Sequence, residues 1–346
     1  MSFSSPIRLR LDGGALAENW STLARLSGNA ATGAAVKANG YGLGAREVAA
    51  RLWKAGCRDF FVAHWAEAEA IADIIPAERI AVLNGAGAAD ISAAMHLGAI
   101  PVLNTPAQLS AWRQARGGRC HVMLDSGINR LGIGPEQLKA GLLDGLDIDI
   151  LMSHLASADE DGRQNPAQLV RFQEMTAGLP YKRKSLANSA GIILGSDYHF
   201  DLTRPGVALY GGIARAELAG LIRPVVGIEA RVLQLRCLQA GETIGYNATH
   251  KCNAPTRVAT IAMGYADGYW RGFSSKGRVR TGEQWLPVLG RVSMDLVTID
   301  ASAAPDLAEG DWVAVDFDLT AASAVTGKSP YELLTGLGQR AERIWA

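Results

Sequence analysis

The sequence places reactive or charged side chains beside several short apolar runs. Lys37 follows the run Gly33–Val36 and leads into an Ala-Asn-Gly-Tyr-Gly turn. Three further polar groups also come after apolar runs, Arg130, His154 and Ser189, whereas Arg204 comes just before the run Val207–Tyr210. Taken singly, each has an ordinary explanation, such as a hydrogen-bonded histidine, a solvated arginine or a helix-capping serine. Together they are hard to explain as independent accidents, and we interpret them as one candidate site.

This mixture of residue types has a chemical logic. A lysine amine can form a Schiff base with a carbonyl group, and a serine near glycine backbone amides can hold a phosphate. Arginine is a donor only, so it can bind a carboxylate or a ring acceptor. An aldehyde, a phosphate and a ring nitrogen are combined in pyridoxal phosphate. The histidines are scattered and form no Cys/His ligand group, so we predict no metal site.

The elements that carry these residues alternate between apolar strands and helical segments. About eight such βα units in roughly 200 residues favour a closed (β/α)8 TIM-type barrel, whose active site lies at the carboxyl ends of the strands. A doubly wound sheet is the alternative, but residues 40–44 (Gly-Tyr-Gly-Leu-Gly) do not fit its usual glycine spacing. The predicted strands are Gly33–Val36, Phe60–Ala63, Ile80–Leu83, Ile100–Leu103, Cys120–Leu124, Ile148–Met152, Lys184–Ala187 and Val207–Tyr210. The predicted helices are Ala45–Ala55, Ala66–Ile75, Ala89–Leu97, Pro106–Ala115 and Pro166–Thr176.

The composition changes near residue 221, where strands and turns replace the helical segments. We therefore predict a barrel over residues 11–220 and a mainly β domain over 221–346. The alternating segment 5–11 is expected to pair with the second domain, so that residues 1–10 supply a strand to it. The predicted strands of this domain are Val225–Leu235, Thr256–Met263, Gln284–Leu289, Asp295–Ile299 and Trp312–Phe317.

Composition narrows the class of protein. The 346 residues are 48% apolar and carry no net charge, which gives no support for a nucleic-acid or anionic-membrane partner. The amino terminus lacks the pattern of a signal peptide, and no apolar run is long enough to span a bilayer. The four cysteines form no CxxC pair. Reduced thiols of this kind are typical of a cytoplasmic protein.

Several motifs resemble one known family. Residues 35–42, Ala-Val-Lys-Ala-Asn-Gly-Tyr-Gly, resemble the cofactor-lysine motif of the bacterial alanine racemases, which are pyridoxal-phosphate enzymes of fold type III. The resemblance continues, in family order, through residues 124–132, 153–159, 187–191, 204–211, 241–246, 264–268 and 290–295. It implies a homodimeric enzyme with active sites shared between subunits. Its reaction would interconvert L-alanine and D-alanine and supply D-alanine for peptidoglycan synthesis.

The resemblance also implies roles for individual residues. Lys37 would bind the cofactor covalently and act as one catalytic base, and Tyr246 of the other subunit would be the second base on the opposite face. Arg130 and the backbone of Met294, also from the other subunit, would receive the substrate carboxylate, with Asp295 beside them. The remaining cofactor contacts would be made by Tyr41, His154, Ser189, Arg204, Gly206 and Val207.

The sequence departs from the family pattern at two positions. Many relatives carry a modified lysine where this chain has Met123, so the acceptor that orients Arg130 is left open. An ungapped alignment places Gln339 where relatives often have a phosphate-contacting tyrosine. Two alternatives stay open at this point. One is a serine or broad-specificity racemase of the same fold, and the other is a non-catalytic pyridoxal-phosphate carrier, a class that generally lacks the second domain.

Overall fold

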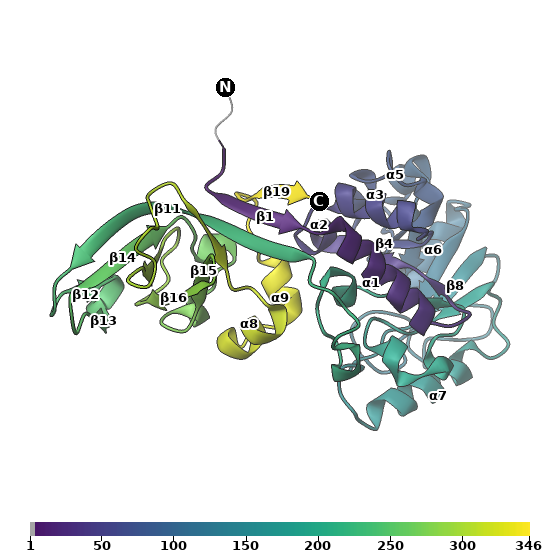
Figure 1. Ribbon diagram of the computed structural model, residues 1–346. Helices are drawn as coiled ribbons and strands as arrows, with labels where there is room; N and C mark the ends of the chain where they lie inside the picture. Colours follow the sequence, from purple (N-terminus) through teal and green to yellow (C-terminus); the bar gives the residue numbers. More distant parts are fainter. Residues whose placement is uncertain (1–3) are drawn as a thin grey trace. The chain divides into compact units, whose positions relative to one another are not determined.

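The computed structural model describes residues 4–346, which fall into two compact units. Residues Ala15–Arg223 form one, here named the barrel unit. Residues up to Gly14 together with Pro224–Ala346 form the other, here named the β unit. Figure 1 shows the elements of each unit in sequence colours. Within residues 4–346, no helix combines the length and the apolar composition needed to cross a bilayer.

The barrel unit is built on parallel strands whose spatial order is their order in the sequence. Seven strands, β3 to β9, form one sheet, and each pairs in parallel with the next. They are β3 (Ala34–Ala35), β4 (Phe60–Val62), β5 (Ile80–Val82), β6 (Ile100–Leu103), β7 (Cys120–Met123), β8 (Ile148–Met152) and β9 (Arg183–Ser185).

Strand β10 (Leu202–Thr203) supplies the eighth position and closes the barrel. On one side it pairs in parallel with β2 (Ala31–Thr32), which leads into β3, and the Ala35 N–H donates to the carbonyl of Pro205 at 2.9 Å. On the other side the Arg204 N–H donates to the Ala187 carbonyl at 2.8 Å, just beyond β9. The predicted TIM-type barrel is confirmed, and the doubly wound alternative is wrong.

The prediction of the eighth strand at Val207–Tyr210 was wrong. These residues form a 3-10 helix, η4 (Val207–Tyr210), and the strand lies just before them as β10. All four residues of η4 are buried, and a short run that is apolar on every side does not distinguish a strand from a buried helical turn. Arg204 therefore follows the eighth strand rather than preceding it. It reaches the same end of the barrel as the residues that follow the other strands.

Helices surround the strands of the barrel unit (Figure 1). Most of the predicted helices are present, but the segment 66–75 is helical only as far as Glu69. The barrel interior is filled by one cluster of buried side chains, made of Phe61, Ala81, Val102, Met123, Ile150, Met152 and Leu202. The helices are α1 (Gly13–Leu26), α3 (Ala45–Ala55), α4 (Trp65–Glu69), α5 (Ile91–Leu97), α6 (Pro106–Gln114) and α7 (Gln164–Thr176).

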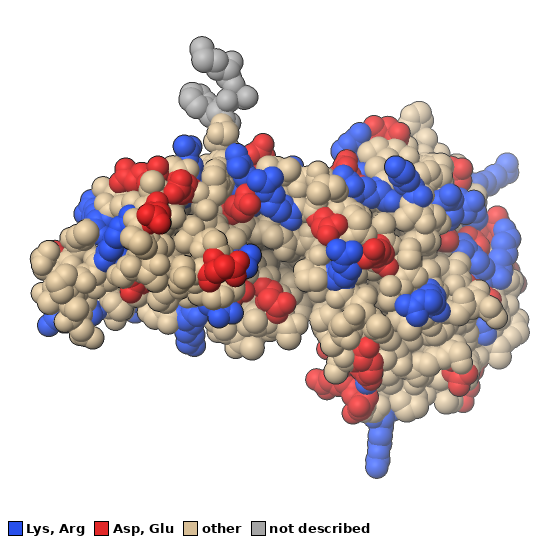
Figure 2. All heavy atoms as spheres, in the orientation of Figure 1, with Lys and Arg blue, Asp and Glu red and all other residues tan. Residues whose placement is uncertain are grey.

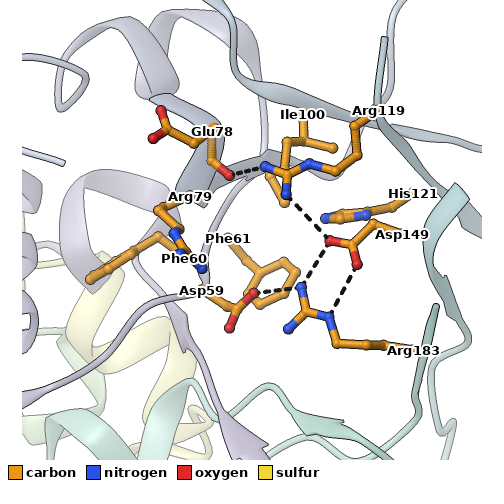
Figure 3. Close-up of a pocket in the computed structure, with 11 residues that line it drawn as sticks. Asp59, Phe60, Phe61, Glu78, Arg79, Ile100, Arg119, His121, Asp149 and Arg183 are labelled. Atoms are coloured by element: carbon orange, nitrogen blue, oxygen red, sulfur yellow. Dashed lines mark hydrogen bonds and ion pairs between the residues drawn. The ribbon is translucent and has the colours of Figure 1, made fainter. Parts of the chain in front are cut away.

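The amino end of the barrel is closed by a cluster of charged side chains (Figure 3). Arg183 at the start of β9 donates to Asp149 and to Asp59, both at 2.9 Å, and Arg119 lies 4.0 Å from Asp149. His121 on β7 is buried beside them. Active sites of TIM barrels lie at the opposite, carboxyl end. We therefore interpret this cluster as part of the framework that holds the strands together.

The β unit contains one eight-stranded, mostly antiparallel sheet with the order β14-β17-β16-β15-β18-β11-β1-β19. Its longest strand is β11 (Val226–Leu238), which pairs antiparallel with β1 (Ile7–Leu11). The strand predicted from Asp295 begins two residues later, as β17 (Val297–Asp300). The remaining elements are β12 (Thr243–Ile244), β13 (His250–Lys251), β14 (Thr256–Ile261), β15 (Arg278–Thr281), β16 (Gln284–Leu289), β18 (Trp312–Val315), β19 (Glu342–Trp345), α8 (Leu319–Thr326) and α9 (Pro330–Thr335).

Charged side chains are dispersed over the face shown in Figure 2. Lys and Arg lie among Asp and Glu on the barrel unit and on the β unit alike. This distribution matches the net charge of zero. Neither unit presents a broad basic surface on this face, of the kind a nucleic-acid partner would need.

Candidate active site

Lys37 begins a strained turn at the exit of strand β3. The following residues, Ala38, Asn39, Gly40 and Tyr41, all have positive φ, between 53° and 62°. Together they make one turn of left-handed helix, labelled α2 (Lys37–Tyr41). Left-handed geometry costs a non-glycine residue roughly 1–2 kcal/mol. Strain of this kind persists only where surrounding contacts hold it, and it clusters at functional sites.

Side chains on both sides hold this turn in place. The Glu67 carboxylate accepts the Ala38 N–H at 2.6 Å through Oε1 and the Ala63 N–H at 2.7 Å through Oε2. Asn39 Oδ1 accepts the N–H of Ala45, the first residue of α3, at 2.9 Å. The turn is therefore fastened to the end of β4 and to the start of α3, and these contacts offset its backbone strain.

The Lys37 amine lies in an environment that disfavours its charged form. Lys37 is half-buried, and burial lowers its pKa, as do the positive charges of Arg130 and Arg204. Glu67 acts in the opposite direction and raises it, but the net shift is downward. A lysine with a lowered pKa is neutral more often near pH 7, which suits it as a nucleophile or a base.

Tyr41 and Gly206 form a tight contact at the same end of the barrel. Tyr41 is buried and stacks on Tyr210, with ring centroids 4.6 Å apart and an angle of 21° between the planes. The Tyr210 hydroxyl donates to the Ala35 carbonyl at 2.8 Å. A Cβ at Gly206 would lie only 2.3 Å from Tyr41 Oη. Only glycine fits here, and the absence of a side chain brings the 206–207 backbone next to the Tyr41 hydroxyl.

Ser189 completes a group of small donors around this backbone. Its Oγ accepts the N–H of Gly206 at 2.9 Å and the N–H of Ala208 at 3.3 Å. With these two N–H groups occupying its acceptor positions, the hydroxyl can still donate its own proton. Ser189 and Val207 are both buried. The serine and tyrosine hydroxyls, lying next to the Val207 backbone, form a group of donors that suits a phosphate.

Arg204 is a buried guanidinium held by neutral groups. It donates to Ser185 Oγ and to the Ser153 carbonyl, the latter at 2.5 Å. Burial lowers the pKa of Arg204 to about 10. Within residues 4–346, both hydrogen-bond acceptors of this side chain are uncharged, although buried charged groups are usually paired with an opposite charge. An arginine placed in this way suits a neutral acceptor, such as an unprotonated ring nitrogen.

His154 follows strand β8 and is partly accessible to solvent. Burial of the imidazole is the main cause that lowers the pKa of His154 to about 3, and the positive charges of Arg204, Arg130 and Lys37 lower it further. Its ring is therefore neutral at physiological pH. In the described part of the chain, no hydrogen bond joins this ring to Arg204.

Arg130 stands at the end of a loop ordered by Asp125. Asp125 Oδ1 accepts the backbone N–H groups of residues 127–129 at 2.9–3.1 Å, and Asn129 takes a left-handed φ of 56°. Arg130 itself is exposed. Met123, two residues before Asp125, is buried in the barrel interior. The loop backbone thus positions the arginine, while Met123 supplies packing and no charge.

Tyr246 and Met294, the two residues expected from the other subunit, both belong to the β unit. Tyr246 begins a 3-10 helix, η6 (Tyr246–Ala248), and is 65% exposed. Met294 is 53% exposed, and its carbonyl accepts the Ala266 N–H at 3.0 Å. A Cβ at Gly264 would lie 2.2 Å from that carbonyl oxygen. The 264–268 turn is therefore packed directly against the Met294 backbone and fixes it.

Two residues that hold the site segments in place were not predicted from the sequence. Glu67 holds the turn after Lys37, and Arg340 holds the turn beside Met294. Arg340 donates to both oxygens of Asp267 at 2.9 Å and to Asp295 at 2.7 Å. Gln339, which precedes it, is exposed. Glu67 lies in the short helix α4, and Arg340 lies in a loop near the chain end. The sequence contains no local signal for either contact.

Two models of known domain families match this chain. The family model described as "Alanine racemase, N-terminal domain" matches residues 11–214, and the one described as "Alanine racemase, C-terminal domain" matches residues 225–345. These two matches span nearly all of the chain.

Individual relatives align along nearly their whole length. The chain is 42% identical over 350 residues to an alanine racemase of Acidiphilium cryptum, covering 97% of this chain and 98% of that protein. It is 42% identical over 354 residues to a catabolic alanine racemase of Agrobacterium fabrum, covering 97% and 91%. A crystal structure of alanine racemase from Bartonella henselae with covalently bound pyridoxal phosphate matches with a TM-score of 0.92 at 35% identity, covering 99% of this chain and 100% of that chain.

Proposed function

The chain belongs to the family of pyridoxal-phosphate-dependent alanine racemases, and from this premise we propose that it interconverts L-alanine and D-alanine with Lys37 and Tyr246 as two opposed bases. Family membership makes the protein an isomerase and makes pyridoxal 5'-phosphate its cofactor. The assignment of individual residues, the two-base mechanism and the biological role are our proposal. Its main support is the half-buried Lys37 amine with a lowered pKa at the carboxyl end of the barrel.

The residues of the barrel unit fit the cofactor. The close approach of Gly206 to the Tyr41 hydroxyl leaves a backbone cradle that a Cβ would fill, and Ser189 adds a buried hydroxyl. Tyr41, Ser189, Gly206 and Val207 would hold the phosphate. Arg204 would donate to the ring nitrogen, His154 would lie beside the ring, and Lys37 would provide the covalent attachment. When bound, the cofactor supplies a conjugated system that takes up the charge left by removal of an α-proton.

Racemisation requires a proton to leave one face of the α-carbon and another to arrive on the opposite face. A single base would have to cross the molecular plane between the two events, and two bases avoid that movement. Lys37 Nζ would hold or release the proton on one face, and its lowered pKa favours the neutral form that a base requires. Tyr246 Oη would do the same on the other face.

We infer that the enzyme is a homodimer in which Tyr246 and Met294 of one subunit complete the site of the other. Both are large side chains, yet both are more than half exposed in the single chain. Exposed apolar and aromatic groups of this kind mark interaction surfaces when they gather. Arg130 would receive the substrate carboxylate together with the Met294 backbone. A fully active monomer would contradict this part of the proposal.

Two further parts of the proposal concern the biological role of the enzyme and its location in the cell. We propose that the D-alanine produced serves peptidoglycan synthesis, a role suggested by the family resemblance rather than by the reaction itself. A cytoplasmic location is supported by the free thiols of Cys57, Cys120, Cys237 and Cys252, because such thiols are typical of reducing compartments.

One experiment tests the reaction directly. Incubation of the holoenzyme with L-alanine in deuterium oxide should give D-alanine together with deuterium at the α-carbon of both enantiomers. No exchange in enzyme that contains bound cofactor would contradict the proposal. Comparison of kcat/KM for alanine and serine tests the substrate, because a carboxylate-binding arginine alone does not select a side chain. We expect alanine to be preferred.

A further inference from the structure

Glu67 joins two neighbouring barrel strands at the candidate site, although none of the roles above includes it. It is the middle residue of the short helix α4, and its side chain is 15% exposed. One carboxylate oxygen accepts the Ala38 N–H and the other accepts the Ala63 N–H, at 2.6 and 2.7 Å. Ala38 follows β3 and Ala63 follows β4. A single carboxylate therefore holds the exits of both strands.

The hydrogen bond to Ala38 lies where the left-handed backbone turn begins. Ala38 is the first of the four left-handed residues and comes directly after Lys37. Alanine has no polar side chain that could stabilise this geometry locally, as asparagine can. The Glu67 carboxylate binds the beginning of the turn, while Asn39 binds the start of α3. Loss of the first contact would release the backbone that sets the direction of the Lys37 side chain.

The charge of Glu67 also acts on the lysine. The other charged groups that act on Lys37 are Arg130 and Arg204, and both are positive. Two histidines lie nearby. The His154 ring interacts with Lys37, and His64 Nε2 lies 3.8 Å from Glu67 Oε1. Glu67 is the carboxylate in this set, and it favours the protonated amine against two guanidinium groups.

We propose that Glu67 is a positioning residue for Lys37, because its carboxylate fixes the left-handed turn that carries the lysine and supplies a counter-charge to the amine. This inference rests on the proposed role of Lys37 as cofactor lysine and base. It assigns two separable effects to one side chain. The position of the left-handed turn depends on the reach of the carboxylate, and the counter-charge to the Lys37 amine depends on its ionised state.

Three variants of the holoenzyme separate these effects. Glu67→Gln keeps the size of the side chain but removes its charge and leaves one of the two N–H groups facing an amide NH2. Glu67→Asp keeps the charge but shortens the reach by one methylene group. Glu69→Gln removes an exposed carboxylate from the same helix and is the matched control. The readouts are hydrogen exchange of peptides covering residues 34–44 and the pH profile of kcat for alanine.

We expect exchange in residues 34–44 to be on the order of tenfold faster in E67Q and in E67D, since each loses a charge-assisted hydrogen bond to a backbone N–H. A base must be neutral, so the acid limb of the pH profile follows Lys37. Removing a charge that favours the protonated amine should move this limb to lower pH in E67Q and leave it in place in E67D. E69Q should match the wild type in both readouts.

The proposal is overturned if E67Q and E67D exchange like E69Q, or if the acid limb of E67Q does not move. If E67Q does not fold, the exchange rate of E67D decides the positioning role. Absence of racemisation by the wild type would instead contradict the proposed function. The hydrogen-exchange comparison needs no turnover, so it would still test whether Glu67 holds the turn that carries Lys37.

Discussion

The hydroxyl of Tyr41 lies so close to Gly206 that a Cβ added at Gly206 would come within 2.3 Å of Oη. Gly206→Ala should therefore push Tyr41 out of place and disturb the donors that we assign to the cofactor phosphate. Each charge-assisted hydrogen bond contributes about 1.5–3 kcal/mol, so we expect cofactor affinity to fall about 10- to 100-fold. Titration of apo-protein with pyridoxal phosphate, followed by visible absorbance, measures this change.

Two controls show whether the clash is responsible. In the double variant Gly206→Ala with Tyr41→Phe, the colliding oxygen is gone, so the second substitution should add little to the first. Gly118→Ala places a Cβ where no atom lies within 4 Å and should leave affinity unchanged. Wild-type affinity in Gly206→Ala would show that this contact does not shape the site.

Tyr246→Phe tests the two-base proposal. The variant should still exchange the α-proton of one enantiomer with solvent, because Lys37 remains. We expect exchange from the other enantiomer to fall by a further factor of about 100 or more, as is typical when a general acid–base is lost. Proton NMR in deuterium oxide follows both enantiomers. Equal losses would argue against opposed bases, and Tyr331→Phe, at another exposed tyrosine, serves as control.

Much of the arrangement follows from the sequence because parallel strands bring their carboxyl ends together. Lys37, His154 and Ser189 each follow an apolar run, and a barrel places all such positions at one end. The fold prediction is confirmed, whereas the roles of these residues stay predictions. Arg204 was expected before its strand and lies after it, because the buried run Val207–Tyr210 was mistaken for the strand.

The contacts that hold the site could not be predicted in the same way. Of the four left-handed residues that follow Lys37, only Gly40 is a glycine, so the residue types do not predict a left-handed turn. Glu67 reaches Ala38 across 29 residues, and Arg340 reaches Asp267 across 73. Pairs at such separations leave no periodic pattern, and only the folded geometry identifies them.

His121 gives a prediction about acid stability. The side chain is buried in the barrel, and burial lowers its pKa to about 3, from a reference value near 6.5. Between these pH values the unfolded chain binds a proton that the folded chain does not, so stability falls as pH falls. A single histidine of this kind removes about 2 kcal/mol from the free energy of unfolding between pH 7 and pH 5.

His121→Gln should therefore reduce the slope of the free energy of unfolding against pH by the contribution of one proton. Denaturant unfolding at a series of pH values measures this slope. His154 has a similarly lowered pKa, so part of the slope should remain. His121 lies at the amino end of the barrel, away from the candidate site, and the variant should keep its activity at pH 8. An unchanged slope would contradict the assignment of a neutral buried histidine.

Arg340 provides the last prediction, on the β unit. The Asp267 side chain is 1% exposed, and Arg340 binds both of its oxygens, while the Gly264 N–H donates to it at 3.0 Å. Arg340→Gln removes the positive charge and leaves a buried carboxylate without its partner, which should reduce the free energy of unfolding by about 3 kcal/mol. Asp295→Asn breaks the other, half-exposed contact of Arg340 and should cost less than about 1 kcal/mol. Denaturant unfolding measures both.

The decisive comparison is the double variant Arg340→Gln with Asp267→Asn. If the penalty comes from an unpaired buried charge, neutralising that charge should recover part of the lost free energy of unfolding. Recovery would show that the pair stabilises the turn against Met294 electrostatically, whereas strictly additive losses would mean that Arg340 acts through packing alone.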